Sequence, residues 1–198
     1  MQFHLNGFRT GDPEIAEPTD DQGIAWSAQG LSDEVDVLIV GCGPAGLTLA
    51  AQLSAFPDIK TRIVEQKSGP LLIGQADGIA CRTVEMFEAF GFSERVLKEA
   101  YWVNETTFWK PGEETPEIIV RSNRIQDVED DLSEMPHVIL NQARVHDFYL
   151  DVMANSPSRL QPDYERRLVD LKIDPAAASH PVTATFERID ADHQGQME

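Results

Sequence analysis

The stretch that decides the fold runs from Val35 to Glu65 and reads VDVLIVGCGPAGLTLAAQLSAFPDIKTRIVE. An apolar run at Val35–Val40 predicts a buried parallel strand, and a glycine loop, Gly41–Gly46, follows it. The next residues predict a helix that stops before Pro57, because the residue ahead of a proline is pushed out of helical geometry. A second strand is expected over Thr61–Gln66. This order of strand, glycine loop, helix, strand and terminal acid is typical of a dinucleotide-binding βαβ unit.

Each glycine of the loop has a distinct expected task. Gly41 permits the tight turn, and Gly43 lets the backbone approach a pyrophosphate without a side chain in between. Gly46 lets the helix pack closely on the first strand. Pro44 and Ala45 open the helix, whose N-terminus offers free amide groups and about half a positive charge to phosphates.

An acidic residue stands where the second strand ends. Glu65 lies 19 residues after Gly46, and Gln66 follows it. A carboxylate at this place accepts hydrogen bonds from ribose hydroxyls and repels a 2′-phosphate, which makes NADP a poor candidate for this pocket. The glycine loop alone does not separate FAD from NAD.

The composition is that of a soluble globular protein. The chain has 198 residues, 41% of them hydrophobic and 25% charged. Its net charge of −18 disfavours nucleic acid and anionic membrane surfaces as partners, since both attract Lys and Arg clusters. No apolar run approaches the roughly 20 residues of a membrane span, and the N-terminus lacks a signal pattern. Cys42 and Cys81 show no metal-binding spacing, so no metal is expected. A cytoplasmic location is the resulting expectation.

The rest of the chain alternates between helical and strand patterns. We expect an irregular acidic arm over residues 1–34, because Gly, Pro, Asp and Glu are scattered there without periodicity. Residues 67–81 predict a long loop, and long loops in compact domains are often functional. The further expected elements are a helix from Thr83 to Gly91, a hairpin of Tyr101–Lys110 with Ile118–Val128, a strand at His137–Leu140, a helix around Val145–Val152, and paired strands near 169–173 and 182–186.

A second motif bears on the choice of dinucleotide. The segment Gly74–Phe87 reads GQADGIACRTVEMF. Together with GCGPAGL, VEQK, PHVILNQARVHDFYL and the opening MQFHLNGFR, it resembles the flavin-dependent aromatic hydroxylases of the phenol 2-monooxygenase type, along nearly the whole chain. The resemblance implies FAD as the bound cofactor, with NAD(P)H and O2 as co-substrates.

The resemblance also implies residues for the cofactor. Gly41, Gly43, Gly46 and Glu65 would bind the ADP half of FAD. Further cofactor-binding residues are implied in or beside the matching motifs; they are Pro44, Ala45, Gln66, Gln75, Arg82 and Gln142. Arg82 matches the family arginine that contacts the flavin phosphate region. Gln142 matches the family glutamine that lies beside the flavin chain. Taken alone, Arg82 is better explained as a solvated first-turn residue and Gln142 as a helix cap.

Two further residues are implied at the substrate. Asp77 matches a family aspartate near the isoalloxazine and the substrate hydroxyl, where a carboxylate could orient that hydroxyl and take its proton. Without the resemblance, Asp77-Gly78 would be interpreted as a turn. His137 matches a histidine of the substrate pocket, and a histidine at the start of a buried strand is an equally good interpretation.

The fold class expected from both lines of reasoning is α/β. It consists of a Rossmann-like FAD-binding βαβ sheet with helices on both faces over 35–198, interleaved with segments of a second β-sheet substrate domain around 101–128 and 166–189. The family continues beyond this length and carries DG and GD motifs that are missing here in a matching context, since the lone GD is Gly11-Asp12. We therefore expect the N-terminal part of such an enzyme, with an unpaired sheet edge and an uncovered apolar face.

The leading functional hypothesis is the FAD-binding portion of a monooxygenase that hydroxylates phenol or a 3-hydroxybenzoate-like compound through a flavin C4a-hydroperoxide. A homodimer is possible at full length. Two alternatives stay open, a non-catalytic FAD-binding fragment and an NAD-dependent dehydrogenase. Flavin absorbance in the purified protein distinguishes the dehydrogenase from the other two.

Overall fold

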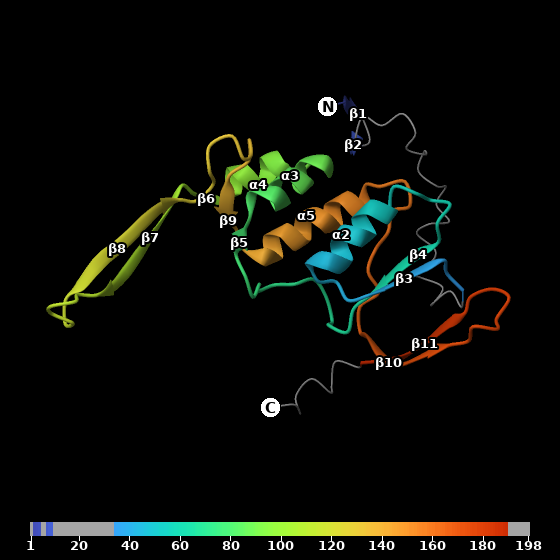
Figure 1. Cartoon of the computed structure of the whole chain (residues 1–198). Coiled ribbons are helices and arrows are strands. Elements are labelled where there is room, and N and C mark those ends of the chain that lie inside the picture. The colour runs from blue at the N-terminus through green and yellow to red at the C-terminus, as the bar shows by residue number, and fades with distance from the viewer. Residues whose placement is uncertain (1, 5–6, 10–33, 190–198) are drawn as a thin grey trace. The chain divides into compact units, whose positions relative to one another are not determined.

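The computed structural model describes residues 2–4, 7–9 and 34–189 (Figure 1). The chain divides into two compact units. The first contains the described parts of Met1–Leu72 and His146–Glu198, and the second is Ile73–Val145. Within the described ranges, no helix has both the length and the apolar character that crossing a membrane requires.

The first unit is built on the predicted βαβ motif. Strands β3 (Val37–Val40) and β4 (Thr61–Val64) pair in parallel, and α2 (Pro44–Leu53) connects them. The α/β fold class is thus confirmed. Both strands are shorter than predicted: residues 35 and 36 precede β3, and β4 ends at Val64 before Glu65, whose N–H donates to the Asp163 carbonyl at 2.9 Å. The helix ends before Pro57, as predicted.

Two helices supply much of the core of this unit. Helix α5 (Gln142–Ala154) lies beside α2 (Figure 1), and the Thr48 and Tyr149 hydroxyls bond at 2.8 Å. Burying one large apolar side chain stabilises a fold by about 1.5–3 kcal/mol. The buried apolar residues here include Ile39, Leu47, Ala50, Ala51, Ile63, Val64, Phe148, Tyr149 and Met153.

The second unit combines two helices with a small antiparallel sheet. Its helices are α3 (Cys81–Ala89) and α4 (Ser93–Glu99), and the Phe87 and Phe92 rings between them have centroids 4.8 Å apart. The sheet has the order β5-β9-β6. Its strands are β5 (Gly78–Ile79), β9 (His137–Ile139) and β6 (Tyr101–Val103).

The prediction of a loop over residues 67–81 is wrong at its C-terminal end. β5 lies within this range, and α3 begins at Cys81 rather than at Thr83. The partner of β5 is β9, with Gly78 opposite Ile139. A two-residue strand whose partner is so distant in the chain leaves no local periodicity, so the sequence pattern could not show it.

Each unit also contains a hairpin of longer strands. β7 (Glu105–Pro111) pairs antiparallel with β8 (Ile119–Gln126), and β10 (Arg166–Ile173) with β11 (Val182–Arg188), which confirms both predicted strand pairs. The expected single strand Tyr101–Lys110 is instead divided between β6 and β7, because β6 pairs with β9. Both hairpins carry exposed large apolar side chains, namely Phe108, Trp109, Ile119, Ile125, Val169, Leu171, Ile173 and Val182.

The expectation of an irregular N-terminal arm is wrong near its start. β1 (Gln2–His4) and β2 (Gly7–Arg9) form an antiparallel pair. Three-residue strands are too short to show an alternating pattern in the sequence. The stretch 10–33 of the predicted arm lies outside the described residues.

Candidate functional site

The glycine loop, Gly41–Gly46, forms a tight turn between β3 and α2. Gly41 has φ +103°, a conformation that favours glycine, and its N–H donates to the Val64 carbonyl at 2.7 Å. A Cβ on Gly46 would overlap the Gly41 carbonyl oxygen, whereas a Cβ on Gly43 would meet no atom within 4 Å. The backbone at Gly43 therefore faces open space.

The start of α2 adds hydrogen-bond donors to this open space. Gly43 is the N-cap residue, Pro44 opens the helix, and no side chain caps it. The first N–H groups of a helix have no partner within the helix, so those of Ala45 and Gly46 are oriented toward the loop side. A pyrophosphate matches this combination of free donors and positive helix end.

Glu65 connects the glycine loop to the end of β4. Its carboxylate is buried and accepts two backbone hydrogen bonds, from Cys42 N–H at 2.8 Å and from Lys67 N–H at 3.0 Å. Each carboxylate oxygen keeps a further lone pair. The predicted ribose acceptor thus also holds the loop in place, while Gln66, next to it, is exposed.

A buried ion pair below the loop was missed by sequence reasoning. Arg62 Nε lies 2.6 Å from Asp163 Oδ2, with the side chains 10% and 18% exposed. Asp163 also donates its N–H to the Ile63 carbonyl at 2.9 Å, which places its backbone alongside β4. The two charged residues are far apart in the chain, and nothing in the local sequence around Asp163 indicates the pairing.

The surroundings of the loop disfavour charged forms of three side chains. Burial, aided by the negative charges of Glu65 and Asp163, raises the pKa of the Cys42 thiol to about 12. Burial likewise raises the pKa of Tyr164 to about 12 and lowers the pKa of His146. Cys42 is therefore a protonated thiol and not a nucleophile at neutral pH.

The second unit brings together another pair of predicted cofactor residues. Gln75 donates its backbone N–H to Gln142 Oε1 at 2.8 Å. A Cβ on Gly74 would overlap the Gln142 Cβ, so glycine is required for this approach. The capping role considered for Gln142 belongs to Asn141, whose Oδ1 accepts the Ala143 N–H at 2.8 Å. The Gln142 side chain instead fixes the loop that carries Gln75.

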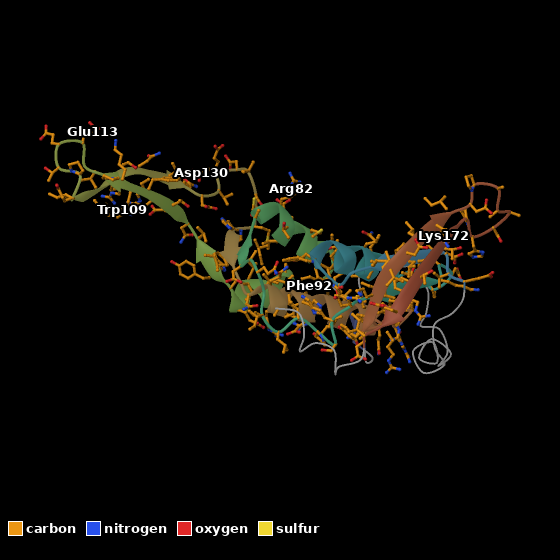
Figure 2. The ribbon with its side chains drawn as sticks, turned by 90° about the horizontal axis from the view of Figure 1, so that it is seen from below. Arg82, Phe92, Trp109, Glu113, Asp130 and Lys172 are labelled. Carbon is orange, nitrogen blue, oxygen red and sulfur yellow. The ribbon has the colours of Figure 1, made fainter. Side chains whose placement is uncertain are left out.

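Arg82 occupies the first turn of α3, with its side chain 90% exposed (Figure 2). Among the described residues it forms an ion pair with Glu85, at 3.4 Å, and an exposed ion pair of this kind is worth about 0–1 kcal/mol. The guanidinium is thus available for an anionic ligand, which is what the predicted flavin-phosphate role requires.

The two predicted substrate residues lie at paired strands, His137 on β9 and Asp77 directly before β5. Asp77 precedes β5, is exposed, and accepts the Leu140 N–H at its carbonyl oxygen at 2.8 Å. His137 opens β9 with its side chain 31% exposed. A Cβ on Gly78 would lie 3.5 Å from His137 Nε2, so this nitrogen faces the strand that begins next to Asp77.

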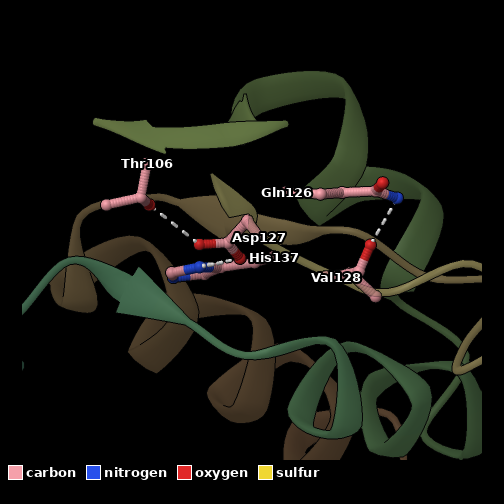
Figure 3. Close-up of polar contacts among 5 residues, drawn as sticks. All are labelled: Thr106, Gln126, Asp127, Val128 and His137. Carbon is pink, nitrogen blue, oxygen red and sulfur yellow. Dashed lines mark hydrogen bonds and ion pairs between the residues drawn. The ribbon is translucent and has the colours of Figure 1, made fainter. Parts of the chain in front are cut away.

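Sequence reasoning missed the partners of His137. Asp127 Oδ2 lies 2.6 Å from His137 Nδ1, and Thr106 Oγ1 lies 3.2 Å from Asp127 Oδ1 (Figure 3). The three residues come from β7, the segment after β8, and β9. Neither Thr106 nor Asp127 belongs to a recognisable motif, so the sequence offered no signal for this contact.

Comparison with known proteins identifies the family. A family model described as an FAD binding domain matches residues 34–187. The 3-hydroxybenzoate 4-monooxygenase of Comamonas testosteroni is 65% identical over 198 residues, which are 100% of this chain and 31% of that protein. The FAD-dependent monooxygenase terD of Aspergillus terreus is 39% identical over 76% of this chain and 24% of its own length. This chain thus spans about a third or less of these relatives.

Solved structures agree with the fold. The flavin-dependent monooxygenase PieE, determined in complex with FAD and substrate, gives a TM-score of 0.61 at 25% identity, covering 77% of this chain and 26% of PieE. The p-nitrophenol 4-monooxygenase PnpA from Pseudomonas putida gives 0.60 at 18% identity over 71% of this chain and 34% of its own, a likeness of fold. The predicted choice of FAD over NAD is confirmed by the family match. This chain belongs to the FAD binding domain family.

Proposed function

We propose that this chain is the FAD-binding portion of a monooxygenase that hydroxylates a small phenolic compound, phenol or a 3-hydroxybenzoate-like molecule, with NAD(P)H and O2 as co-substrates. The observation that carries the proposal is the 65% identity to a 3-hydroxybenzoate 4-monooxygenase along all 198 residues. Bound FAD would supply the redox and oxygen chemistry. The residues of this chain bind the cofactor, orient the substrate and hold its proton.

The glycine loop and its helix would hold the pyrophosphate of FAD. Gly43 faces open space, and the first N–H groups of α2, at Ala45 and Gly46, have no helical partner. Glu65 keeps lone pairs for the ribose hydroxyls while its two backbone hydrogen bonds keep the loop in place. Gly41 and Pro44 shape the turn into the helix, and Gln66 adds an exposed polar side chain after Glu65.

A second set of residues, in the second unit, would contact the flavin side of the cofactor. The Gln75 backbone and the Gln142 amide form one hydrogen-bonded element at 2.8 Å. Arg82 offers a largely free guanidinium, whose planar donors suit a phosphate oxygen. We propose this set on the motif match and on the local geometry of each residue.

Asp77 and His137 would act on the substrate hydroxyl. Asp77 is exposed directly before β5, and His137 Nε2 faces Gly78, the first residue of β5. Electrophilic attack on an aromatic ring is easier when its hydroxyl is closer to the phenolate form. A carboxylate within hydrogen-bond reach orients that hydroxyl and takes its proton, which is the role proposed for Asp77. His137 would hold the same or a neighbouring substituent.

FAD titration of two glycine variants tests the cofactor part of this proposal. Gly43→Ala adds a methyl group where the pyrophosphate would approach, and we expect FAD affinity to fall at least about tenfold, or about 1.4 kcal/mol. Gly69→Ala is the matched control, because a Cβ there also meets no atom within 4 Å but lies outside the loop. The measurement is flavin fluorescence quenching at equal protein stability. Equal FAD affinity in both variants would refute the proposed pyrophosphate site.

Turnover tests the enzymatic part. Oxidation of NADH or NADPH that is stimulated by 3-hydroxybenzoate or phenol supports a monooxygenase and excludes a non-catalytic flavin-binding fragment. A colourless protein stabilised by NAD and not by FAD would support the dehydrogenase alternative. The same proposal includes a FAD-binding domain over 35–198, with substrate-domain segments around 101–128 and 166–189. It also includes a cytoplasmic location and a homodimer at full length.

A further inference from the structure

Asp127 is held from two directions at the place where it meets His137 (Figure 3). Its backbone N–H donates to the Asn104 carbonyl at 3.0 Å, which anchors the segment after β8 at the junction of β6 and β7. One side-chain oxygen is 3.2 Å from the Thr106 hydroxyl, and the other is 2.6 Å from His137 Nδ1. Asp127 and His137 are 17% and 31% exposed in their side chains, so solvent competes only partly for the bond between them.

The chemistry of the pair assigns the proton on the ring. An ionised carboxylate only accepts hydrogen bonds, so at 2.6 Å the His137 Nδ1 must be the donor. A charge-assisted bond of this length is stronger than a neutral one. In a neutral imidazole one nitrogen carries hydrogen and the other accepts, and the bond at one nitrogen decides the state of the other. Nε2 of the neutral ring therefore carries a lone pair.

The surroundings of Nε2 differ from those of Nδ1. The Gly78 position opposite it has no side chain, and a Cβ built there would come to 3.5 Å from Nε2. Asp77, the residue before Gly78, is exposed. The ring thus has one nitrogen committed to Asp127 and the other directed at a strand that leaves space beside it.

We propose that Asp127, supported by Thr106, is a positioning residue that holds the His137 ring with Nδ1 as the donor and presents Nε2 at β5 as a hydrogen-bond acceptor. The role of Nε2 toward a phenolic hydroxyl rests on the proposed function; the tautomer and the orientation of the ring do not. Asp127 itself touches neither cofactor nor substrate and acts through His137.

The tautomer of His137 is measurable directly. In the whole chain labelled with ¹⁵N-histidine, a long-range ¹H–¹⁵N spectrum distinguishes Nδ1–H from Nε2–H, and the His137→Gln variant assigns the resonances. We expect the neutral wild-type ring in the Nδ1–H form. Asp127→Ala should shift the tautomer ratio at least about tenfold toward Nε2–H, whereas Asp127→Asn, which keeps an acceptor oxygen, should retain Nδ1–H.

Two comparisons keep the test specific. Asp130→Ala is the matched control, because it also removes a carboxylate, and that carboxylate bonds the Gln126 amide at 2.8 Å rather than His137. It should leave the His137 spectrum unchanged. If Asp127→Ala fails to fold, the wild-type spectrum still decides, since an Nε2–H tautomer there overturns the inference.

The test is also separate from that of the proposed function, because the spectrum needs neither flavin nor substrate. A chain that binds no FAD but shows the Nδ1–H tautomer contradicts the proposed function alone. A chain that binds FAD normally but shows Nε2–H, or the same tautomer ratio in wild type and Asp127→Ala, contradicts the role of Asp127 alone.

Discussion

The glycine loop and the histidine cluster differ in the atoms that form them. The histidine cluster consists of Thr106, Asp127 and His137. The loop offers backbone N–H groups and empty space, and its shape depends on positions where side chains are missing. The histidine cluster depends on side-chain atoms of three separate segments that meet within 3.2 Å. A backbone site should therefore fail when atoms are added, and a side-chain cluster when atoms are removed.

The largest expected effect concerns the ion pair of Arg62 and Asp163. It is an exception to this contrast, because it is a side-chain contact in the unit that contains the glycine loop. Asp163→Ala leaves the Arg62 guanidinium, which is 10% exposed, without its partner at 2.6 Å. Breaking a buried pair in this way costs about 3 kcal/mol or more, because the remaining charge stays desolvated. Urea unfolding measures the loss. Asp170→Ala, which removes an exposed carboxylate 3.5 Å from Lys172, should cost less than about 1 kcal/mol, and an equal loss in both variants would contradict the prediction.

The next effect tests the loop itself. Gly46→Ala would drive a Cβ into the Gly41 carbonyl oxygen and to 3.4 Å from Ile39 Cγ2, so α2 must move away from β3. We expect a loss of about 2–3 kcal/mol in the free energy of unfolding, in the range of overpacked cores. Gly43→Ala, in open space, should change stability by less than about 0.5 kcal/mol. Equal stability of the two variants would contradict the close packing of α2 on β3 at Gly46.

The same contrast explains how much the sequence could predict. The βαβ unit was predictable because its strands, loop and helix are consecutive, and the task of each glycine follows from the position it holds in the turn. Gln142 and Asp77 entered through a family motif, and the structure adds what motifs do not carry, the bond from Gln75 N–H to Gln142 Oε1. Contacts such as Asp163 with Arg62, or Asp127 with His137, join segments distant in the chain, and they leave no trace in periodicity or spacing.

Short strands could not be predicted from the sequence for a related reason. β5 has two residues, and its pairing with β9 decides its existence. The division of the expected strand at 101–110 likewise follows from β6 pairing with β9 while β7 pairs with β8. Strand propensity reports a pleated, half-buried surface and does not specify the partner.

A smaller effect, confined to high pH, tests the dry environment of the loop. The folded chain raises the pKa of Cys42 from 9.0 to about 12. Above pH 9 the unfolded chain therefore loses this proton while the folded chain keeps it, and stability falls with rising pH between 9 and 12. Cys42→Ala should flatten the fall between pH 9 and 10 in urea titrations. Above pH 10 a slope remains, because the pKa of Tyr164 is also raised to about 12. Cys81→Ala should keep the wild-type slope, and a flattened slope in that variant would contradict the assignment to Cys42.

The smallest effect on stability concerns the histidine cluster and is the most specific. Gly78→Ala adds a Cβ at 3.5 Å from His137 Nε2, which is an ordinary van der Waals contact. Gly78 does not have a positive φ, so alanine fits its backbone conformation. The free energy of unfolding should change by less than about 1 kcal/mol, or rise slightly, because alanine restricts the unfolded chain. The His137 tautomer should also stay unchanged, since Asp127 and Thr106 are untouched.

Access to Nε2 is what Gly78→Ala should remove. Diethyl pyrocarbonate reacts with an accessible imidazole nitrogen, and mass spectrometry after proteolysis measures its rate at each histidine. We expect the added methyl group to slow modification of His137 and to leave exposed His180 unaffected. An unchanged rate at His137 with an unchanged tautomer would mean that Nε2 is approached from a direction that Gly78 does not control. That result would contradict the proposal that Nε2 is presented at β5. It would not contradict the hydrogen bond between Asp127 and His137.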